Sequence, residues 1–178
     1  MLHEIDWHAR AKAVALPNRP FIDGKYVDSL SGESFACIYP GDGRLLTQVA
    51  SCNEADVDVA VRSARRAFDS GVWSRMAPAD RRRILLLFSE LILANREELA
   101  LLETLNVGKP IANAYNGDTV SAAACIAWYA EAIDKVYGEV AATAHDMTTL
   151  VVREPLGIVA AVVPWNYPLF LAVAPLVG

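Results

Sequence analysis

The sequence feature that most constrains the fold is an apolar run at residues 157–163 that ends in the turn PWNYP at residues 164–168. A run rich in valine and alanine, bounded by glycine and proline, predicts a buried parallel strand. The two prolines of the turn fix φ and bias the residues before them toward extended backbone. The turn is therefore expected at the carboxyl end of this strand, where open α/β sheets bind ligands.

Asn166 is the side chain of this turn that carries an amide NH2. A neutral double donor at the end of a strand is suited to stabilising an oxyanion. Asparagine is also common in turns that carry no chemistry. The pattern alone leaves both interpretations open.

Composition excludes several classes of partner. The 178-residue chain has a net charge of −5, which argues against nucleic acid and anionic membrane surfaces. Its basic run, Arg81-Arg82-Arg83, opens a predicted helix and indicates a solvated face. No signal peptide is expected, because the first residues are charged and lack an apolar segment. The longest apolar run, residues 84–93, is too short to span a bilayer.

The cysteines indicate a reducing compartment. Cys37, Cys52 and Cys125 are odd in number and form no CxxC pair, so a cytoplasmic protein with free thiols is expected. Cys125 lies in an apolar helical segment, where a packing role is expected rather than that of a nucleophile.

Turn and capping residues predict the elements upstream. Asp23-Gly24 predicts a hairpin, and residues 35–40 and 45–50 read as two further strands. Asn53 is expected to cap a helix. Gly138 ends the helical region, and two extended pieces follow around residues 139–144 and 148–153. His145, between them, is expected on the surface rather than at a metal.

Helical periodicity predicts which faces are buried. The expected core positions are Val57, Ala60, Val61, Ala64 and Phe68 in the first long helix, and Ile84, Leu87, Phe88 and Leu91 in the second. Trp128, Tyr129 and Ile133 are also interpreted as core rather than as a cofactor site.

Several blocks of the sequence together resemble the aldehyde dehydrogenase family. The matching blocks are FIDGK at 21–25, DVD at 56–58 with Ala60-Val61, ETL at 103–105 with GKP at 108–110, REPLG at 153–157 and PWNYPL at 164–169. The segment WYAEAIDKVYGEV at 128–140 is most similar to the branch that oxidises γ-glutamyl-γ-aminobutyraldehyde in putrescine degradation.

The resemblance implies a fold and a division of the chain. The expected class is α/β, the amino-terminal part of the aldehyde dehydrogenase fold, with an incomplete Rossmann-like cofactor domain, a helical bundle and an oligomerisation hairpin. Residues 1–20 would form an arm and 21–138 the first part of the cofactor domain. Residues 139–154 would form the oligomerisation hairpin, and 155–178 a Rossmann-type strand, the PWNYP turn and a truncated helix.

The resemblance also implies residue roles. Asn166 matches the oxyanion-stabilising residue, and Val163, Pro164, Trp165 and Asn166 match the segment that lines the cofactor crevice. The implied reaction oxidises a small aldehyde, including aminoaldehydes, through a cysteine thioester with NAD as cofactor and NADP as the alternative. The resemblance also implies that the full-length protein assembles as a homo-oligomer.

Departures from the family pattern limit this expectation. The nucleophilic Cys, the general-base Glu and the ribose-binding Lys match no residue here, and the three cysteines present do not align with the nucleophile. The isolated chain is therefore expected to be inactive. Asn106 stands where many relatives carry Asp, which weakens any monovalent-cation site. The alternative is a short, non-catalytic protein or truncated product that only associates with full-length subunits.

Overall fold

The computed structural model describes residues 5–177, which form a mixed α/β arrangement. The helices are α1 (Trp7–Ala13), α2 (Glu54–Ser70), α3 (Pro78–Ala94), α4 (Arg96–Val107), α5 (Ile111–Asn113), the π-helical η2 (Ala114–Asp118), α6 (Thr119–Ala132) and α7 (Pro168–Val177). The strands are β1 (Phe21–Ile22), β2 (Lys25–Tyr26), β3 (Ser34–Ile38), β4 (Leu45–Ala50), β5 (Glu139–Ala141) and β6 (Thr149–Val151). They pair as three antiparallel two-stranded sheets, β1–β2, β3–β4 and β5–β6.

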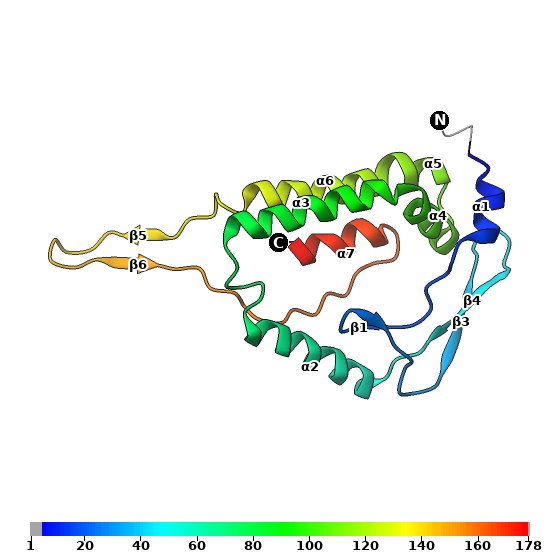
Figure 1. Ribbon diagram of the computed structural model, residues 1–178, viewed down its shortest axis with the longest axis horizontal. Helices are drawn as coiled ribbons and strands as arrows, with labels where there is room; N and C mark the ends of the chain where they lie inside the picture. The colour runs from blue at the N-terminus through cyan, green and yellow to red at the C-terminus, as the bar shows by residue number, and fades with distance from the viewer. Residues whose placement is uncertain (1–4, 178) are drawn as a thin grey trace.

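A helical bundle holds the main core. Helices α3 and α6 lie along one another, and α7 packs on α6 (Figure 1). The buried cluster consists of Leu85, Ile92, Ala122, Ala123, Ile126, Ala130 and Val173. The small alanine side chains of α6 allow the neighbouring helices to approach closely. The buried Ser89 hydroxyl donates a hydrogen bond to the Ala123 carbonyl at 2.8 Å.

Local chemistry fixes the elements that precede the bundle. Asp23 and Gly24 both adopt positive φ, as a two-residue hairpin turn requires, which confirms the predicted turn between β1 and β2. Asn53 and Asp56 form a reciprocal capping box at the start of α2, which confirms the predicted cap. Strands β3 and β4 occupy the two predicted segments.

The expected parallel strand at residues 157–163 is not formed. Within the described residues, no strand is found between β6 and α7, and Leu156 and Val162 are 97% and 99% exposed. The reason is that a strand needs a neighbour, and no other described segment lies beside this one to exchange backbone hydrogen bonds. Apolar composition indicated burial, whereas this chain supplies no sheet to bury the segment.

Three of the predicted buried faces were also wrong in detail. Val57, Val61 and Ala64 of α2 are exposed, because no layer covers that face. In α3 the buried positions are Leu85, Ser89 and Ile92, while Leu87 and Leu91 face solvent. Trp128, expected in the core, is exposed and makes an edge-to-face contact with Tyr129.

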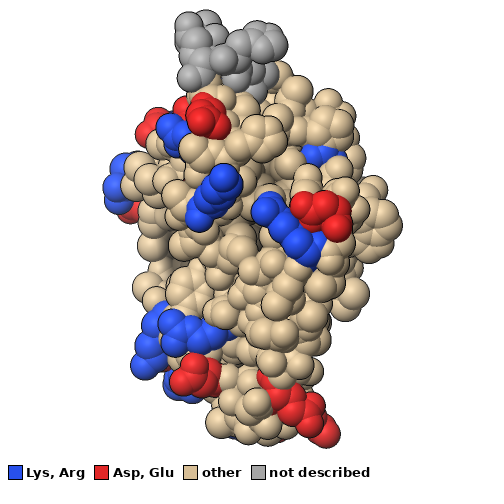
Figure 2. All heavy atoms as spheres, turned by 90° about the vertical axis from the view of Figure 1, so that its right-hand side faces the viewer, with Lys and Arg blue, Asp and Glu red and all other residues tan. Residues whose placement is uncertain are grey.

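Two regions extend away from the bundle. The β5–β6 hairpin projects from one end of the molecule, and almost all of its residues are exposed (Figure 1). His145 lies on the surface, in its connecting loop. The opposite end carries α1 and β3–β4, where basic and acidic side chains are interspersed among uncharged areas with no continuous basic stripe on that face (Figure 2).

Candidate functional site

The site is built around the turn that leads into α7. Residues 165–167 bend the chain, and Pro168 takes the first helical position, where its missing N–H leaves no hydrogen bond unmade. The Leu171 N–H donates to the Tyr167 carbonyl at 3.0 Å and closes the first turn of α7. Asn166 is therefore held just outside a helix start by the prolines on either side.

The Asn166 side chain is exposed. Among the described residues its amide forms no hydrogen bond, so both N–H groups remain available to an external acceptor. A neutral side chain with two free donors can bind a developing negative charge without first breaking an internal bond.

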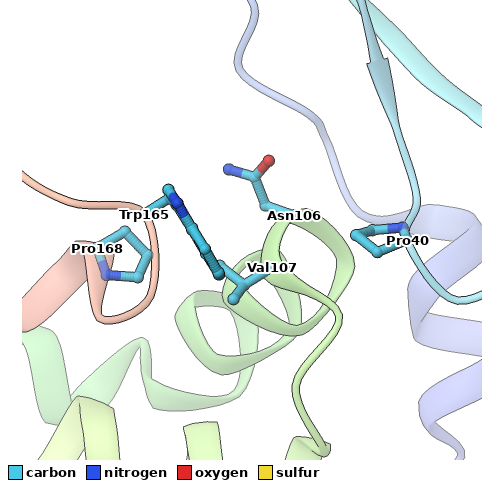
Figure 3. A pocket seen from close by; sticks show the side chains of 5 residues that line it. All are labelled: Pro40, Asn106, Val107, Trp165 and Pro168. Atoms are coloured by element: carbon cyan, nitrogen blue, oxygen red, sulfur yellow. The ribbon is translucent and has the colours of Figure 1, made fainter.

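A shallow hollow of about 420 Å³ lies beside the turn. Trp165 and Pro168 line it from the turn, Asn106 and Val107 line it from the end of α4, and Pro40 lines it from the loop after β3 (Figure 3). The Trp165 indole stands between Pro168 and Val107, and the residue is 77% exposed. Segments more than a hundred residues apart in sequence thus meet at this hollow.

The four residues expected to line a cofactor crevice form one continuous surface. Val163, Pro164, Trp165 and Asn166 are all exposed, and Trp165 alone among them lines the hollow. The structure brings them together as neighbours in the chain. Their role at a cofactor stays a prediction.

A buried charge network lies under the turn, and sequence reasoning missed it. The Lys109 ammonium donates to Glu103 Oε1 at 2.8 Å and to Asp118 Oδ2. The side chains of Lys109, Glu103 and Asp118 are only 13%, 3% and 4% exposed. In the sequence, Lys109 reads as part of a helix stop, and no periodicity links it to carboxylates on α4 and η2. A charged residue in the leucine-rich segment of α4 was the one available signal.

Burial and hydrogen bonding shift the pKa values of this network. Loss of hydration raises the pKa of Glu103, the neighbouring Asp118 carboxyl raises it further, and Lys109 opposes both effects. Burial by itself would lower the pKa of Lys109, but the hydrogen bonds to Asp118 and Glu103 outweigh it and raise that pKa. The raised pKa favours the charged form of Lys109, while Glu103 Oε2 is buried without a hydrogen-bond partner among the described residues.

Tyr167 connects the network to the turn. The Lys109 ammonium lies 4.1 Å from the centroid of the Tyr167 ring, a cation–π distance. The residue next to Asn166 thus rests directly on the buried lysine.

Asn106, at the end of α4, is engaged with Cys37. The Cys37 thiol donates to Asn106 Oδ1 at 3.5 Å. No group of three or more His, Cys, Asp or Glu side chains in the described residues is placed to hold a metal ion. Cys37 and Cys125 are half-buried and Cys52 is exposed, all as free thiols.

No helix in the described range 5–177 combines the length and apolar character needed to cross a membrane.

Known proteins resemble this chain over nearly its whole length. PuuC of Escherichia coli (strain K12), an NADP/NAD-dependent aldehyde dehydrogenase, is 45% identical over 169 residues, which cover 95% of this chain and 34% of PuuC. Aminoacetaldehyde dehydrogenase of Pseudomonas aeruginosa is 42% identical over 171 residues, which cover 96% of this chain and 34% of that protein.

Solved structures agree with the fold. A mutant of the indole-3-acetaldehyde dehydrogenase AldA of P. syringae, in complex with NAD+ and IAA, matches with a TM-score of 0.91 and 55% identity, over 94% of this chain and 34% of that chain. The γ-glutamyl-γ-aminobutyraldehyde dehydrogenase of Burkholderia cenocepacia matches with a TM-score of 0.91 and 50% identity, over 94% and 34% of the two chains. The expected fold and branch are thereby confirmed.

The match to the family is broad but partial in length. The chain spans about a third of the length of these relatives. The sequence model of the aldehyde dehydrogenase family matches residues 26–178. The chain therefore belongs to the aldehyde dehydrogenase family.

Proposed function

We propose that this chain supplies the oxyanion-stabilising part of an NAD(P)-dependent aldehyde dehydrogenase, with Asn166 as the residue that acts on the substrate. The observation that carries the proposal is the free side-chain amide of Asn166, held between two prolines at the entrance to α7 in a member of this family. A cysteine thiolate adding to an aldehyde places a full negative charge on the carbonyl oxygen. The Asn166 amide donates a hydrogen bond to that oxygen.

The nucleophile belongs to the two-thirds of the relatives that this chain does not cover. Cys37 is engaged with Asn106, Cys125 packs in α6 and Cys52 is exposed just before α2, and none of the three matches the family's nucleophile. The adduct breaks down by loss of hydride to a thioester, and water releases the carboxylic acid. Asn166 donates to this oxygen in each tetrahedral adduct, first with the thiolate and then with water, and neither gains nor loses a proton.

The exposed apolar surface next to Asn166 fits a dinucleotide cofactor. Val163 and Trp165 present uncovered aliphatic and aromatic faces, and no charged side chain of the turn opposes a planar ring there. These residues would hold one side of NAD, or of NADP, by apolar contact. When bound, the cofactor accepts the hydride.

The proposed substrates are small aldehydes, with aminoaldehydes first. The names of two relatives support this class, namely aminoacetaldehyde dehydrogenase and γ-glutamyl-γ-aminobutyraldehyde dehydrogenase. A second candidate is indole-3-acetaldehyde, because the AldA structure shares 55% identity with this chain. Comparing kcat/KM for an aminoaldehyde and for indole-3-acetaldehyde decides between them.

The hairpin is proposed to pair subunits of a homo-oligomer. Strands β5 and β6 form an isolated two-stranded ribbon with unpaired outer edges, and Val140, Leu150 and Val152 are exposed on it. Such edges accept a further strand from a second subunit.

The catalytic proposal is tested with Asn166→Ala in the full-length protein that carries this sequence. Loss of one oxyanion donor is expected to lower kcat about 10²–10³-fold while substrate binding changes little. Asn113→Ala is the matched control, since Asn113 is an exposed asparagine on α5 with no side-chain hydrogen bond among the described residues. An Asn166→Ala enzyme with unchanged kcat would overturn the role.

The alternative, a non-catalytic chain that associates with full-length subunits, is separated by two measurements. The first is the intact mass of the polypeptide made in its own cells, captured with an antibody to residues 53–110. A species near 19.3 kDa favours the alternative, and a species several hundred residues longer favours the enzyme. The second is co-expression with a full-length relative, for which the alternative predicts a soluble hetero-complex, whereas insoluble or degraded chain favours the enzyme fragment.

A further inference from the structure

The turn that carries Asn166 lies against the C-terminal end of α4 and the loop that follows it. Trp165 and Pro168 share one hollow with Asn106 and Val107, so the two segments face each other (Figure 3). The contact on this side is apolar and open, and apolar contact is not directional. This apolar contact alone therefore does not fix the orientation of the turn.

The polar anchor of the turn is Lys109. Its ammonium lies 4.1 Å from the Tyr167 ring centroid on one side and is bonded to Glu103 and Asp118 on the other. Three elements therefore fix the lysine: α4 through Glu103, η2 through Asp118, and its own backbone after Gly108. A cation held in this way fixes the position of the aromatic ring that packs on it. The low exposure of the Lys109 side chain strengthens the cation–π attraction.

Leu169 and Phe170, just after the turn, pack against the helical core, but residues 164–167 themselves have few fixed contacts. Across residues 164–167, the one backbone hydrogen bond in the described structure is the bond that the Tyr167 carbonyl accepts from Leu171. The prolines restrict φ but do not determine where the turn points relative to α4. The contact of the Tyr167 ring with Lys109 joins the turn to a buried part of the fold.

We propose that Lys109 is a positioning residue for the oxyanion site. Its hydrogen bonds to Glu103 and Asp118 fix the ammonium, the ammonium fixes the Tyr167 ring by a cation–π contact, and the fixed ring orients the neighbouring Asn166 amide. The proposal rests on the proposed function only for what Asn166 does once it is aimed. The contact between Lys109 and the Tyr167 ring is a property of this chain and can be measured without turnover.

The test uses NMR on the 178-residue chain, at a concentration at which it sediments as a monomer, and does not involve aldehyde or cofactor. The lysine ε-methylene protons that Tyr167 covers should be shifted upfield by the ring, and Lys109→Met identifies that signal by removing it. Tyr167→Phe keeps the aromatic face and should retain the shift, whereas Tyr167→Leu should abolish it. Tyr137→Leu is the matched control, because Tyr137 is an exposed tyrosine in the connection to β5.

The second readout is the local order of Asn166. In the native chain the NMR order parameter of the Asn166 backbone amide is expected near about 0.85, the value of a rigid backbone. In Tyr167→Leu it is expected to fall below about 0.6. Tyr167→Phe and Tyr137→Leu should stay at the native value, and amides of α6 should be unchanged in all three variants. A merely structural role for Tyr167 would lower order in α6 as well.

Tyr167→Leu leaves the buried network intact, so it decides the question even if Lys109→Met fails to fold. An absent upfield signal, or an Asn166 order parameter that is the same in Tyr167→Leu and the native chain, would overturn the positioning role. An intact contact between Lys109 and the Tyr167 ring combined with an active Asn166→Ala enzyme would instead overturn the catalytic proposal alone.

Discussion

Asp56 joins two segments through both of its carboxylate oxygens. Oδ1 accepts the Leu30 N–H at 2.7 Å, and Oδ2 accepts the Asn53 N–H at 3.0 Å at the start of α2. The hydrogen bond from Leu30, followed by that from Asn53, lowers the pKa of Asp56 against a smaller opposing effect of burial. One carboxylate thus ties the loop before β3 to a helix start, and its ionised form accepts both hydrogen bonds more strongly than the protonated form.

The pH dependence of stability follows from the lowered pKa. A carboxyl whose pKa is lower in the folded state stabilises the fold above its ordinary pKa, and this stabilisation is lost as pH falls through the folded value. Asp56→Asn should therefore lower the urea midpoint at about pH 7 and differ less from the native chain at about pH 3. The control is Asp58→Asn on the same helix, where the exposed carboxylate meets only Arg62, at 3.8 Å. Equal losses at both pH values would contradict the assignment.

Residue-level chemistry was the most predictable part of this chain. The Asn53 cap and the Asp23-Gly24 turn are set by atoms within a few residues, and both were predicted correctly. The Lys109 network was not predictable, because Glu103 and Asp118 meet that lysine only once α4 and η2 are packed together. No spacing in the sequence encodes that meeting.

At the scale of elements, α4 ends where the site begins. Gly108 terminates the helix with φ of 81°, and an added Cβ would lie 3.0 Å from the Pro40 Cβ. A left-handed residue and a close approach occur at the same position, immediately before Lys109. The helix end is therefore specified by glycine for two reasons at once.

Gly108→Ala should destabilise the chain by about 1–2 kcal/mol in urea unfolding, because alanine resists the left-handed backbone and would crowd Pro40. Gly117→Ala is the matched control: it lies in η2, its φ is not positive, and nothing lies within 4 Å of its Cβ. That variant is expected to gain about 0.4–1 kcal/mol. Similar effects of both substitutions would show that the left-handed backbone at Gly108 is unimportant.

Element faces were harder to predict than element positions. Helix α3 contains the run Ile84-Leu85-Leu86-Leu87-Phe88, in which every side of the helix is apolar, so periodicity could not select Leu85 over Leu87. The strand at 157–163 failed for another reason: its composition was correct for burial, but pairing depends on a second strand. Both outcomes were decided by neighbours rather than by the segment itself.

The whole molecule exposes far more surface than its mass requires. Its accessible surface is 12237 Å², whereas a compact monomer of 19.3 kDa exposes about 8500 Å². The excess comes from the uncovered face of α2, the segment between β6 and α7, and the hairpin (Figure 1). These are the surfaces on which the sequence had predicted burial or subunit contact.

The isolated chain is therefore expected to self-associate. Its sedimentation coefficient should rise with concentration, and a dye that binds apolar surface should fluoresce on addition. Val57→Lys together with Val61→Glu, on the open face of α2, should weaken both effects. Sedimentation as a single monomer at all concentrations, without dye binding, would contradict this expectation.

The unpaired segment between β6 and α7 also has a consequence for proteolysis. Within the described structure, residues 154–163 form no backbone–backbone hydrogen bonds, and proteases cleave most readily at exposed backbone of this kind. A brief digest should cut here first, and the released α7 should stay bound through the buried Val173 until the sample is denatured. Any strand that pairs with this segment would protect it from cleavage. The rate of this one cleavage therefore reports whether the segment is paired in a sheet.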